Sequence, residues 1–216
     1  MDKEFSAAGT KERLLGAACS VFSEKGYEKA TIAEICKKAD ANIASVNYHY
    51  KNKEELYNEV WRYAHQATIS AYPVDAGVTP SSSPEERLYA FVLAMLKRIL
   101  GKGETSMFMR LMVKEMAEPS ALLHNMIDNT IVPNAMQLSD IIRELLGGKA
   151  TERQVVMCRL SIASQYVIFC FNQPVRKRLF GREELAEQEI NDLAKHITNF
   201  CIAGIESMKD NEVENA

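Results

Sequence analysis

Apolar residues recur at helical spacing along almost the whole chain, and hardly any stretch alternates between apolar and polar positions. In the first such stretch Leu14, Ala18, Val21 and Phe22 lie three or four residues apart, so they share one face of a helix. The strongest short-range hairpin signals, Asn-Gly and Asp-Gly, do not occur. The pattern therefore predicts an all-α protein of about nine helices.

Helix start and stop signals divide the first third of the chain into short helices. The first helix is expected to end just before Gly26, a residue suited to the left-handed conformation that follows many helices. Thr31 followed by Glu34 has the form of a capping box, and Asn42 and Asn52 can each cap a further helix. Short helices with tight connections are therefore expected up to about residue 56.

The segment PVDAGVTPSSSP, residues 73–84, is the clearest break in composition. Longer helices are expected after it, at about 85–100, 104–117, 120–146, 151–173 and 183–208. The predicted domains are a helix-turn-helix domain (1–55), a connecting helix (56–72), a ligand-binding and dimerisation domain (73–208) and a frayed acidic tail (209–216).

The second and third short helices are separated by about four residues, which is the geometry of a helix-turn-helix. The later helix of such a pair enters the major groove of DNA, so it must be short, firmly held and polar on one side. In residues 43–50, Val46 and Tyr50 can pack inward. The side chains left facing outward are Ser45, Asn47, Tyr48 and His49.

The segment KGYEKATIAEICKKADANIASVNYHYKNKEEL, residues 25–56, resembles the TetR/AcrR signature. The resemblance implies phosphate contact from Thr31, base contacts near Ser45 and Asn47, and contacts to the DNA backbone from Tyr48, His49 and Lys53. The full implied set is Thr31, Ala44, Ser45, Asn47, Tyr48, His49, Lys51 and Lys53. Thr31 could also act only as a helix cap, His49 could be a surface or packing residue, and the two lysines could be solvated turn residues.

Three positions depart from that family pattern. Asp40 stands at a common turn glycine, and aspartate tolerates that backbone nearly as well. Ala44 replaces a common glycine that allows close approach to DNA, and Asn47 replaces a common tyrosine. Because asparagine can bond both N6 and N7 of adenine, Asn47 suggests an altered operator preference.

A regular apolar seam near the carboxyl end predicts a dimer. Residues at spacings of three and four run from Ala186 to Met208 and include small ones that allow close helix approach. A second, strongly apolar helix spans 151–173, and two such helices from each subunit could form a four-helix interface. The predicted interface residues are Tyr166, Phe171, Ile190, Leu193, Ile197, Phe200 and Gly204. An ordinary intramolecular core is the alternative.

A concentration of methionine favours an adaptable cavity for varied apolar ligands. The predicted lining is Met107, Phe108, Arg110, Met112, Met126, Met136 and Phe169. A methionine stripe at helical spacing is more often simple core, and Arg110 can pair with a carboxylate instead of orienting a ligand. The stretches FMRLMVKEMAEPSALLHNMI, VPNAMQLSDIIRELLG and SIASQYVIFCFNQP resemble the C-terminal domain of the CecR-like subgroup, which implies a regulator of transport or drug-sensitivity genes.

Charge and cysteine content indicate which partners and which cellular compartment the sequence favours. With 26 basic and 29 acidic residues the net charge is −3, which argues against non-specific coating of nucleic acid but permits a small basic face. The five cysteines lie in apolar stretches, as reduced core thiols of a cytoplasmic protein would. No secretory leader is recognised, and polar residues interrupt the most apolar stretch, 155–171, so no membrane contact is expected.

An enzyme is not expected. The four histidines lack metal-ligand spacing, and no phosphate-binding glycine loop or nucleophile elbow occurs, so no cofactor or metal is expected either. The sequence instead predicts a homodimeric repressor on a palindromic DNA operator, released by a small, largely apolar effector. Its two reading helices should lie about 34–36 Å apart, or a multiple of that, with the helix of residues 53–72 as the lever. A helical protein–protein adaptor without DNA binding is the alternative.

Overall fold

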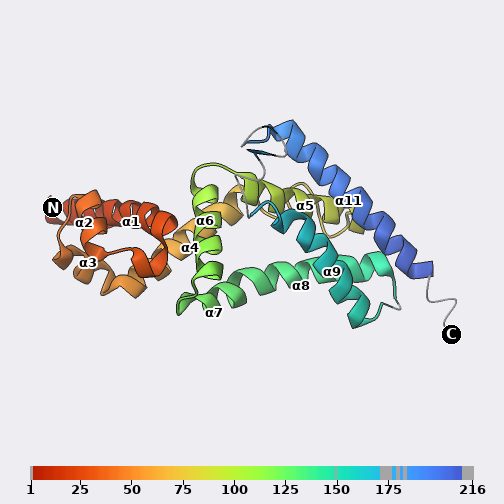
Figure 1. The fold of residues 1–216 in the computed structure, drawn as a ribbon, viewed down its shortest axis with the longest axis horizontal. Helices are drawn as coiled ribbons and strands as arrows, with labels where there is room; N and C mark the ends of the chain where they lie inside the picture. The colour runs from red at the N-terminus through yellow and green to blue at the C-terminus, as the bar shows by residue number, and fades with distance from the viewer. Residues whose placement is uncertain (1, 149, 171–176, 179–180, 182–183, 211–216) are drawn as a thin grey trace. The chain divides into compact units, whose positions relative to one another are not determined.

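The computed structural model describes residues 2–148, 150–170, 177–178, 181 and 184–210, and every regular element among them is helical (Figure 1). The predicted all-α class is confirmed. The elements are α1 (Asp2–Lys29), α2 (Ile32–Ala39), α3 (Ile43–Tyr50), α4 (Lys53–Ala71), α5 (Pro84–Leu100), α6 (Glu104–Ala117), α7 (Leu122–Met126), the π-helix η1 (Ile127–Ile131), α8 (Val132–Leu146), α9 (Glu152–Val167) and α11 (Glu187–Asp210).

The chain forms two compact units, neither of them continuous in sequence. Unit 1 comprises residues 1–70 and 102–124, and unit 2 comprises residues 71–101 and 125–216. Helix α6 therefore packs in the same unit as α1 to α3, although the sequence grouped it with the C-terminal helices. The functional division into reader, connecting helix and sensor stays a prediction.

Unit 1 is built on an aromatic and aliphatic core. Phe22 of α1 meets Tyr57 of α4 with ring centroids 4.8 Å apart, and Trp61 of α4 meets Phe108 of α6 at 4.9 Å. The helical geometry of α1 breaks at Gly26, where φ is 78°, which is where the sequence predicted an end. Such a backbone angle strains any residue with a Cβ atom.

A buried carboxylate fixes α6 within this unit. The side chain of Glu115 is 1% exposed, and it accepts a hydrogen bond of 3.0 Å from the hydroxyl group of Tyr57. Its other oxygen accepts from both the main-chain N–H and the hydroxyl group of Ser120, each at 2.7 Å. The carboxylate thus joins α4, α6 and the turn after α6.

Unit 2 packs α5, α8, α9 and α11 around a second core. Helices α9 and α11 run antiparallel, because Cys158 of α9 lies 3.5 Å from Met208 of α11 while Gln165 lies 3.0 Å from Cys201 (sulfur and amide contacts). Phe91 of α5 packs into the same interior. No helix in the described residues has the length and apolar character needed to cross a membrane.

The single helix predicted at 120–146 is instead α7, the π-helix and α8 in succession. Pro133 gives the physical reason: its ring would clash with the carbonyl group four residues earlier, and it has no N–H to donate. A π-turn relieves this conflict, and the N–H of Val132 bonds to the carbonyl group of Ile127, five residues back. Pro133 is thus the signal in the sequence for this break.

Helices α5 and α6 match their predicted limits to within one residue, whereas α9 and α11 differ more. Helix α9 stops at Val167, earlier than the predicted residue 173, and residues 171–176 lie outside the described residues. Helix α11 begins at Glu187 and extends to Asp210.

Candidate nucleic-acid interface

Two capped helices form the candidate reading motif. The hydroxyl oxygen of Thr31 accepts from the N–H of Glu34 at 3.2 Å, and the Glu34 carboxylate accepts from the N–H of Thr31 at 3.3 Å, so the predicted capping box is present. Asp40 ends α2 in the left-handed conformation, with φ 48° and ψ 55°. An aspartate therefore does occupy the backbone position for which a glycine is common.

Helix α3 is held firmly from behind. Val46 is 0% and Tyr50 is 5% exposed, as the sequence predicted. The hydroxyl group of Tyr50 donates to the main-chain oxygen of Lys11 at 2.8 Å, which fixes the end of α3 against α1. Arg13 of α1 donates to the carbonyl group of Ala39 at 3.1 Å, so the end of α2 is tied to the same helix.

The outward side of α3 carries hydrogen-bonding groups and exposed rings. Ala44 and Asn47 are exposed, and Tyr48 is 79% exposed with its ring centroid 4.9 Å from that of half-buried His49. Ser45 differs from this expectation, because its hydroxyl group bonds to the Asn42 side-chain oxygen at 2.9 Å. The same oxygen also accepts the main-chain N–H of Ser45 at 2.8 Å, so this serine belongs to the helix cap.

Thr31 directly precedes α2, and Lys51 and Lys53 follow α3. Thr31 is exposed and, although its oxygen accepts from Glu34, its own proton is free to reach a phosphate. Lys51 is exposed in the turn after α3. Lys53 is less free, since its ammonium group bonds to the Glu28 carbonyl oxygen at 3.3 Å and lies 4.4 Å above the ring of Tyr27.

Ion pairs remove some lysines from the basic surface. Lys25 pairs with Glu34 at 2.6 Å, and Lys29 pairs with Glu118 at 2.7 Å. Each hydrogen-bonded lysine lowers the pKa of its glutamate, so both carboxylates stay charged. The exposed lysines left for DNA include Lys51 and those at the end of α2.

Sequence reasoning missed Ile43. Its spacing of three and seven residues from Val46 and Tyr50 indicates a shared buried face, yet it is 54% exposed. It is the first residue of α3, directly after the Asn42 cap. Its place in the first turn indicates exposure, because a first-turn side chain projects beyond the packed face of a short helix.

The predicted effector-binding residues lie in different environments. Phe108 is buried against Trp61, while Arg110 is exposed and donates to the Ser106 hydroxyl group at 2.9 Å. Met126 is fully buried, and Met136 is 50% exposed. The half-buried members of the predicted set are Met107, Met112 and Phe169.

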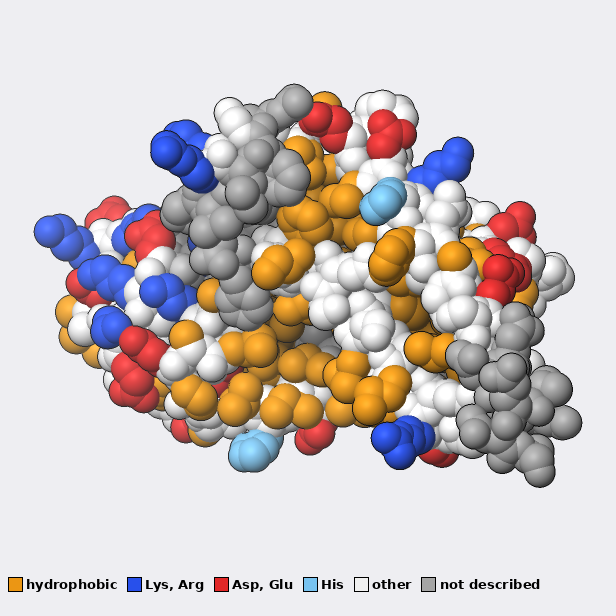
Figure 2. Space-filling model, turned by 45° about the vertical axis from the view of Figure 1, so that its right-hand side comes forward, with side chains coloured by type: hydrophobic (Ala, Val, Ile, Leu, Met, Phe, Trp, Pro, Cys, Tyr) orange, Lys and Arg blue, Asp and Glu red, His pale blue; other side chains and the backbone are white. Residues whose placement is uncertain are grey.

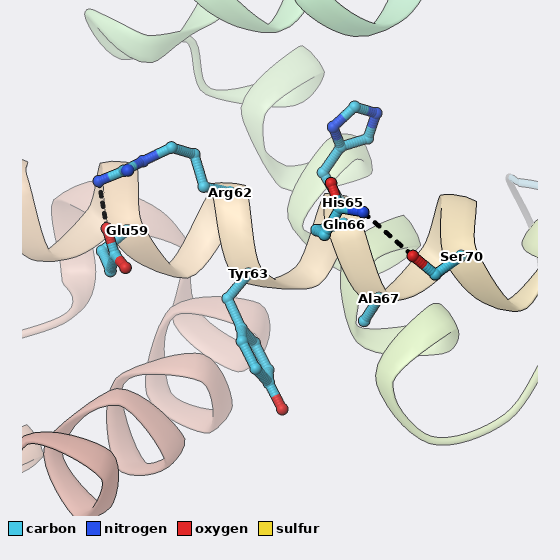
Figure 3. Close-up of a pocket in the computed structure, with 7 residues that line it drawn as sticks. All are labelled: Glu59, Arg62, Tyr63, His65, Gln66, Ala67 and Ser70. Carbon is cyan, nitrogen blue, oxygen red and sulfur yellow. Dashed lines mark hydrogen bonds and ion pairs between the residues drawn. The ribbon is translucent and has the colours of Figure 1, made fainter.

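Two hollows found in the described residues are open surface features. One, of about 580 Å³, is lined by seven residues that all belong to α4, and Figure 3 shows Arg62 and Tyr63 on different sides of this helix. The other, of about 670 Å³, lies between α5, residues 76–82 and α11, and includes Tyr89 and Lys195. Neither is lined by a predicted effector-binding residue.

The predicted interface residues divide into buried and exposed groups. Tyr166, Ile190 and Ile197 are 5%, 8% and 3% exposed, so they pack inside their own subunit. Phe200 is 66% exposed, Gly204 is exposed and Leu193 is half-buried. Phe171 lies outside the described residues.

Helix α9 carries exposed apolar residues that the sequence analysis did not select. Met157 and Leu160 are 50% and 58% exposed, and Ile168, directly after the helix, is 60% exposed. Leu160 and Phe200 thus lie on two helices that contact each other within unit 2. Figure 2 shows apolar side chains gathered across one face of the molecule.

Comparison with protein families assigns both parts of the chain. Residues 14–60 match the model of the bacterial regulatory proteins of the tetR family. Residues 84–205, more than half of the chain, match the C-terminal domain of the HTH-type transcriptional dual regulator CecR.

Curated relatives are described as transcriptional regulators. CecR of Shigella flexneri is 24% identical over 173 residues, which are 74% of this chain and 74% of that protein. The negative regulator IcaR of the biofilm operon icaADBC from Staphylococcus epidermidis is 43% identical over 49 residues, or 23% of this chain and 26% of IcaR. SrpR of Pseudomonas putida is 27% identical over 121 residues, or 55% of this chain and 53% of SrpR. The chain thus spans only about a quarter to a half of these last two relatives.

Solved structures share the fold at low sequence identity. The TetR family regulator PfmR from Thermus thermophilus has a TM-score of 0.62 at 20% identity and covers 87% of this chain and 97% of its own. A TetR-like regulator from Rhodococcus sp. RHA1 has a TM-score of 0.61 at 18% identity, covering 90% and 96%.

Proposed function

Since this chain belongs to the TetR family of transcriptional regulators, with a C-terminal domain of the CecR type, we propose that it acts as a homodimeric, effector-released repressor. In this proposal it binds a palindromic operator through α3, and a small, largely apolar effector lowers that affinity. The genes it controls would concern transport or drug sensitivity.

The observation that carries the DNA part is the asymmetry of α3. One side is buried and hydrogen-bonded to α1, whereas Asn47 and Tyr48 face solvent. A helix held in this way can enter a major groove with fixed side-chain positions. The adaptor alternative leaves the outward-facing polar side chains of this capped helix without a role, and the curated relatives named above are described as regulators.

The dimer part rests on the exposed apolar residues of α9 and α11. Leu160, Ile168 and Phe200 are more than half exposed in the single chain, and Gly204 on α11 has open space around it. Several large apolar side chains exposed to water on two helices that contact each other are typical of a protein–protein interface. Packing against the same helices of a second copy would bury them and generate the two-fold symmetry that a palindromic operator requires.

Repression is proposed over activation because IcaR, which is 43% identical over 49 residues, is described as a negative regulator. CecR, which matches over more of the chain, is described as a dual regulator. Expression of a reporter behind the selected operator should rise when the gene for this protein is deleted. Falling expression would contradict the repressor assignment.

Operator selection tests the DNA part directly. Duplexes enriched by the wild-type protein from a random pool should share a palindromic consensus. Asn47→Ala should relax one position in each half-site, whereas the control Asn199→Ala, on the exposed surface of α11, should leave the consensus unchanged. A folded dimer that enriches no sequence would contradict the proposal.

The effector part predicts a measurable coupling. Small molecules released from the purified protein and added back should weaken operator binding by about 5- to 150-fold, equivalent to 1–3 kcal/mol. A molecule that binds tightly and leaves operator affinity unchanged would argue against the coupling.

A further inference from the structure

Ile43 is an exposed apolar residue at the place where a reading helix first meets DNA. It is 54% exposed, whereas Val46 and Tyr50 of the same helix are buried. Single exposed apolar side chains are common on protein surfaces, so exposure alone carries no function. The neighbours of Ile43 on α3 decide what this side chain can do.

Ile43 shares a helix face with Asn47. The two residues are four apart, which places them one turn from each other, about 6 Å along the helix axis. Asn47 is exposed, and its amide group can both donate to and accept from a base edge. A side chain one turn away can therefore reach a neighbouring base pair in the same groove.

The hydroxyl group of Ser45, which could otherwise contact DNA beside Ile43, is already engaged in a hydrogen bond. Ser45 donates its hydroxyl hydrogen to the Asn42 side-chain oxygen at 2.9 Å, as part of the helix cap. The first turn of α3 thus presents two apolar side chains to DNA, those of Ile43 and Ala44.

Only one feature of the major-groove edge is apolar, the 5-methyl group of thymine. The first residues of a reading helix are those that contact base edges. We propose that Ile43 is a specificity-determining residue that packs on a thymine methyl group in each half-site, next to the base pair contacted by Asn47. This inference rests on the proposed function.

Replacing thymine by deoxyuridine tests it, because this change removes the methyl group and keeps the base pairing. Each thymine of the selected operator is replaced in turn, in both half-sites together, and the affinity of the full-length protein is measured. At one position the wild-type protein should bind about 15-fold more weakly, or about fourfold for each methyl group. In Ile43→Ala the same replacement should change affinity by less than about twofold.

Two further variants separate this contact from a general loss of binding. Ile43→Val keeps a branched apolar side chain and should retain most of the discrimination between thymine and deoxyuridine. Ile131→Ala, a matched truncation of an isoleucine that is 37% exposed in the π-helix, should discriminate as the wild type does.

Some outcomes overturn the inference while the proposed function stands. These are a consensus without thymine, a wild-type protein indifferent to every deoxyuridine, and equal discrimination by Ile43→Ala. If the dimeric wild-type protein selects no sequence, both fail. The deoxyuridine measurement on the wild type keeps the test decisive even if Ile43→Ala folds poorly.

Discussion

The hydroxyl group of Tyr57 and the carboxylate of Glu115 are joined by a hydrogen bond of 3.0 Å in the interior of unit 1. Within the described part of the chain, no basic side chain forms an ion pair with Glu115, and Ser120 supplies the donors to its other oxygen. Burial is the main cause that raises the pKa of Tyr57, and the charge of Glu115 is the second. The tyrosine therefore stays protonated and keeps donating its hydrogen bond to Glu115.

Tyr57→Phe should therefore destabilise the protein by about 1.5–3 kcal/mol, the range for a buried hydrogen bond to a charged group. Chemical denaturation of the two proteins measures the difference. The matched control is Tyr27→Phe, since the Tyr27 ring lies 5.0 Å from that of Tyr57 and its hydroxyl group makes no hydrogen bond in the described residues. Equal loss in both variants would mean that the Glu115 contact contributes little.

Lys51 is held in a strained turn. Its φ is 69° and its ψ is −56°, and the N–H of Asn52 bonds to the Tyr50 carbonyl group at 2.8 Å, which makes a γ-turn of the rarer hand. Lys51→Gly should relieve this strain and stabilise the protein by about 1 kcal/mol. The thermal midpoint should rise accordingly.

The side chain of Lys51 should also contribute to the salt dependence of operator binding. Loss of one phosphate contact per subunit would reduce the slope of log affinity against log salt by about 1.8 for the dimer. Lys51→Ala is the control, because it removes the same charge but leaves the strained backbone. It should lower the slope equally and give no stabilisation, and stabilisation by alanine would refute the strain.

Tyr50 should make stability fall at alkaline pH. Burial, followed by Glu59 and Cys19, raises the pKa of Tyr50 from 10.0 to about 12. Its contribution is complete below pH 10 and is lost as pH rises through the folded-state pKa, because the unfolded chain ionises first. The free energy of unfolding should fall by up to about 1.4 kcal/mol per pH unit between pH 10 and 12 on account of this residue.

Denaturation at several pH values in wild type and Tyr50→Phe isolates that contribution, since other buried tyrosines affect both proteins alike. The variant should show a shallower decline. Val46→Ala, which destabilises the same helix without removing a titrating group, should keep the wild-type slope. An unchanged slope in Tyr50→Phe would show that Tyr50 ionises at its ordinary pKa.

Charged residues on α9 or α11 should separate the proposed dimer. Leu160→Glu and Phe200→Glu should shift the molar mass in solution from dimer to monomer and weaken operator binding, because each would bury a carboxylate at the interface. Met116→Glu, at a residue 50% exposed on α6 in unit 1, should stay dimeric. Monomeric wild-type protein would contradict the interface.

Local signals predicted the reading motif well. The capping box of Thr31 and Glu34, the cap at Asn42 and the buried pair Val46 and Tyr50 all depend on residues a few positions apart. Such features can be inferred from spacing alone, because helix geometry fixes which neighbours meet.

Contacts between distant segments were not predictable in the same way. The seam that includes Ile190 and Ile197 has the same spacing whether it faces a partner or its own core, and in the structure these two residues are buried in their own subunit. The Tyr57–Glu115 bond joins positions 58 residues apart, and nothing in the local pattern of either helix indicates it. The π-helix was indicated by Pro133, but a proline signals a break without specifying its form.

The discontinuity of unit 1 limits how such a regulator can be recombined. Hybrid regulators that join one reading head to a foreign sensor at residue 55 or 72 would leave α6 behind. In a head cut at residue 72, the ring of Trp61 would be exposed and Tyr57 would lose its acceptor. The exchangeable cassette for building new genetic switches is therefore two pieces of sequence, 1–70 and 102–124, which must be transplanted together.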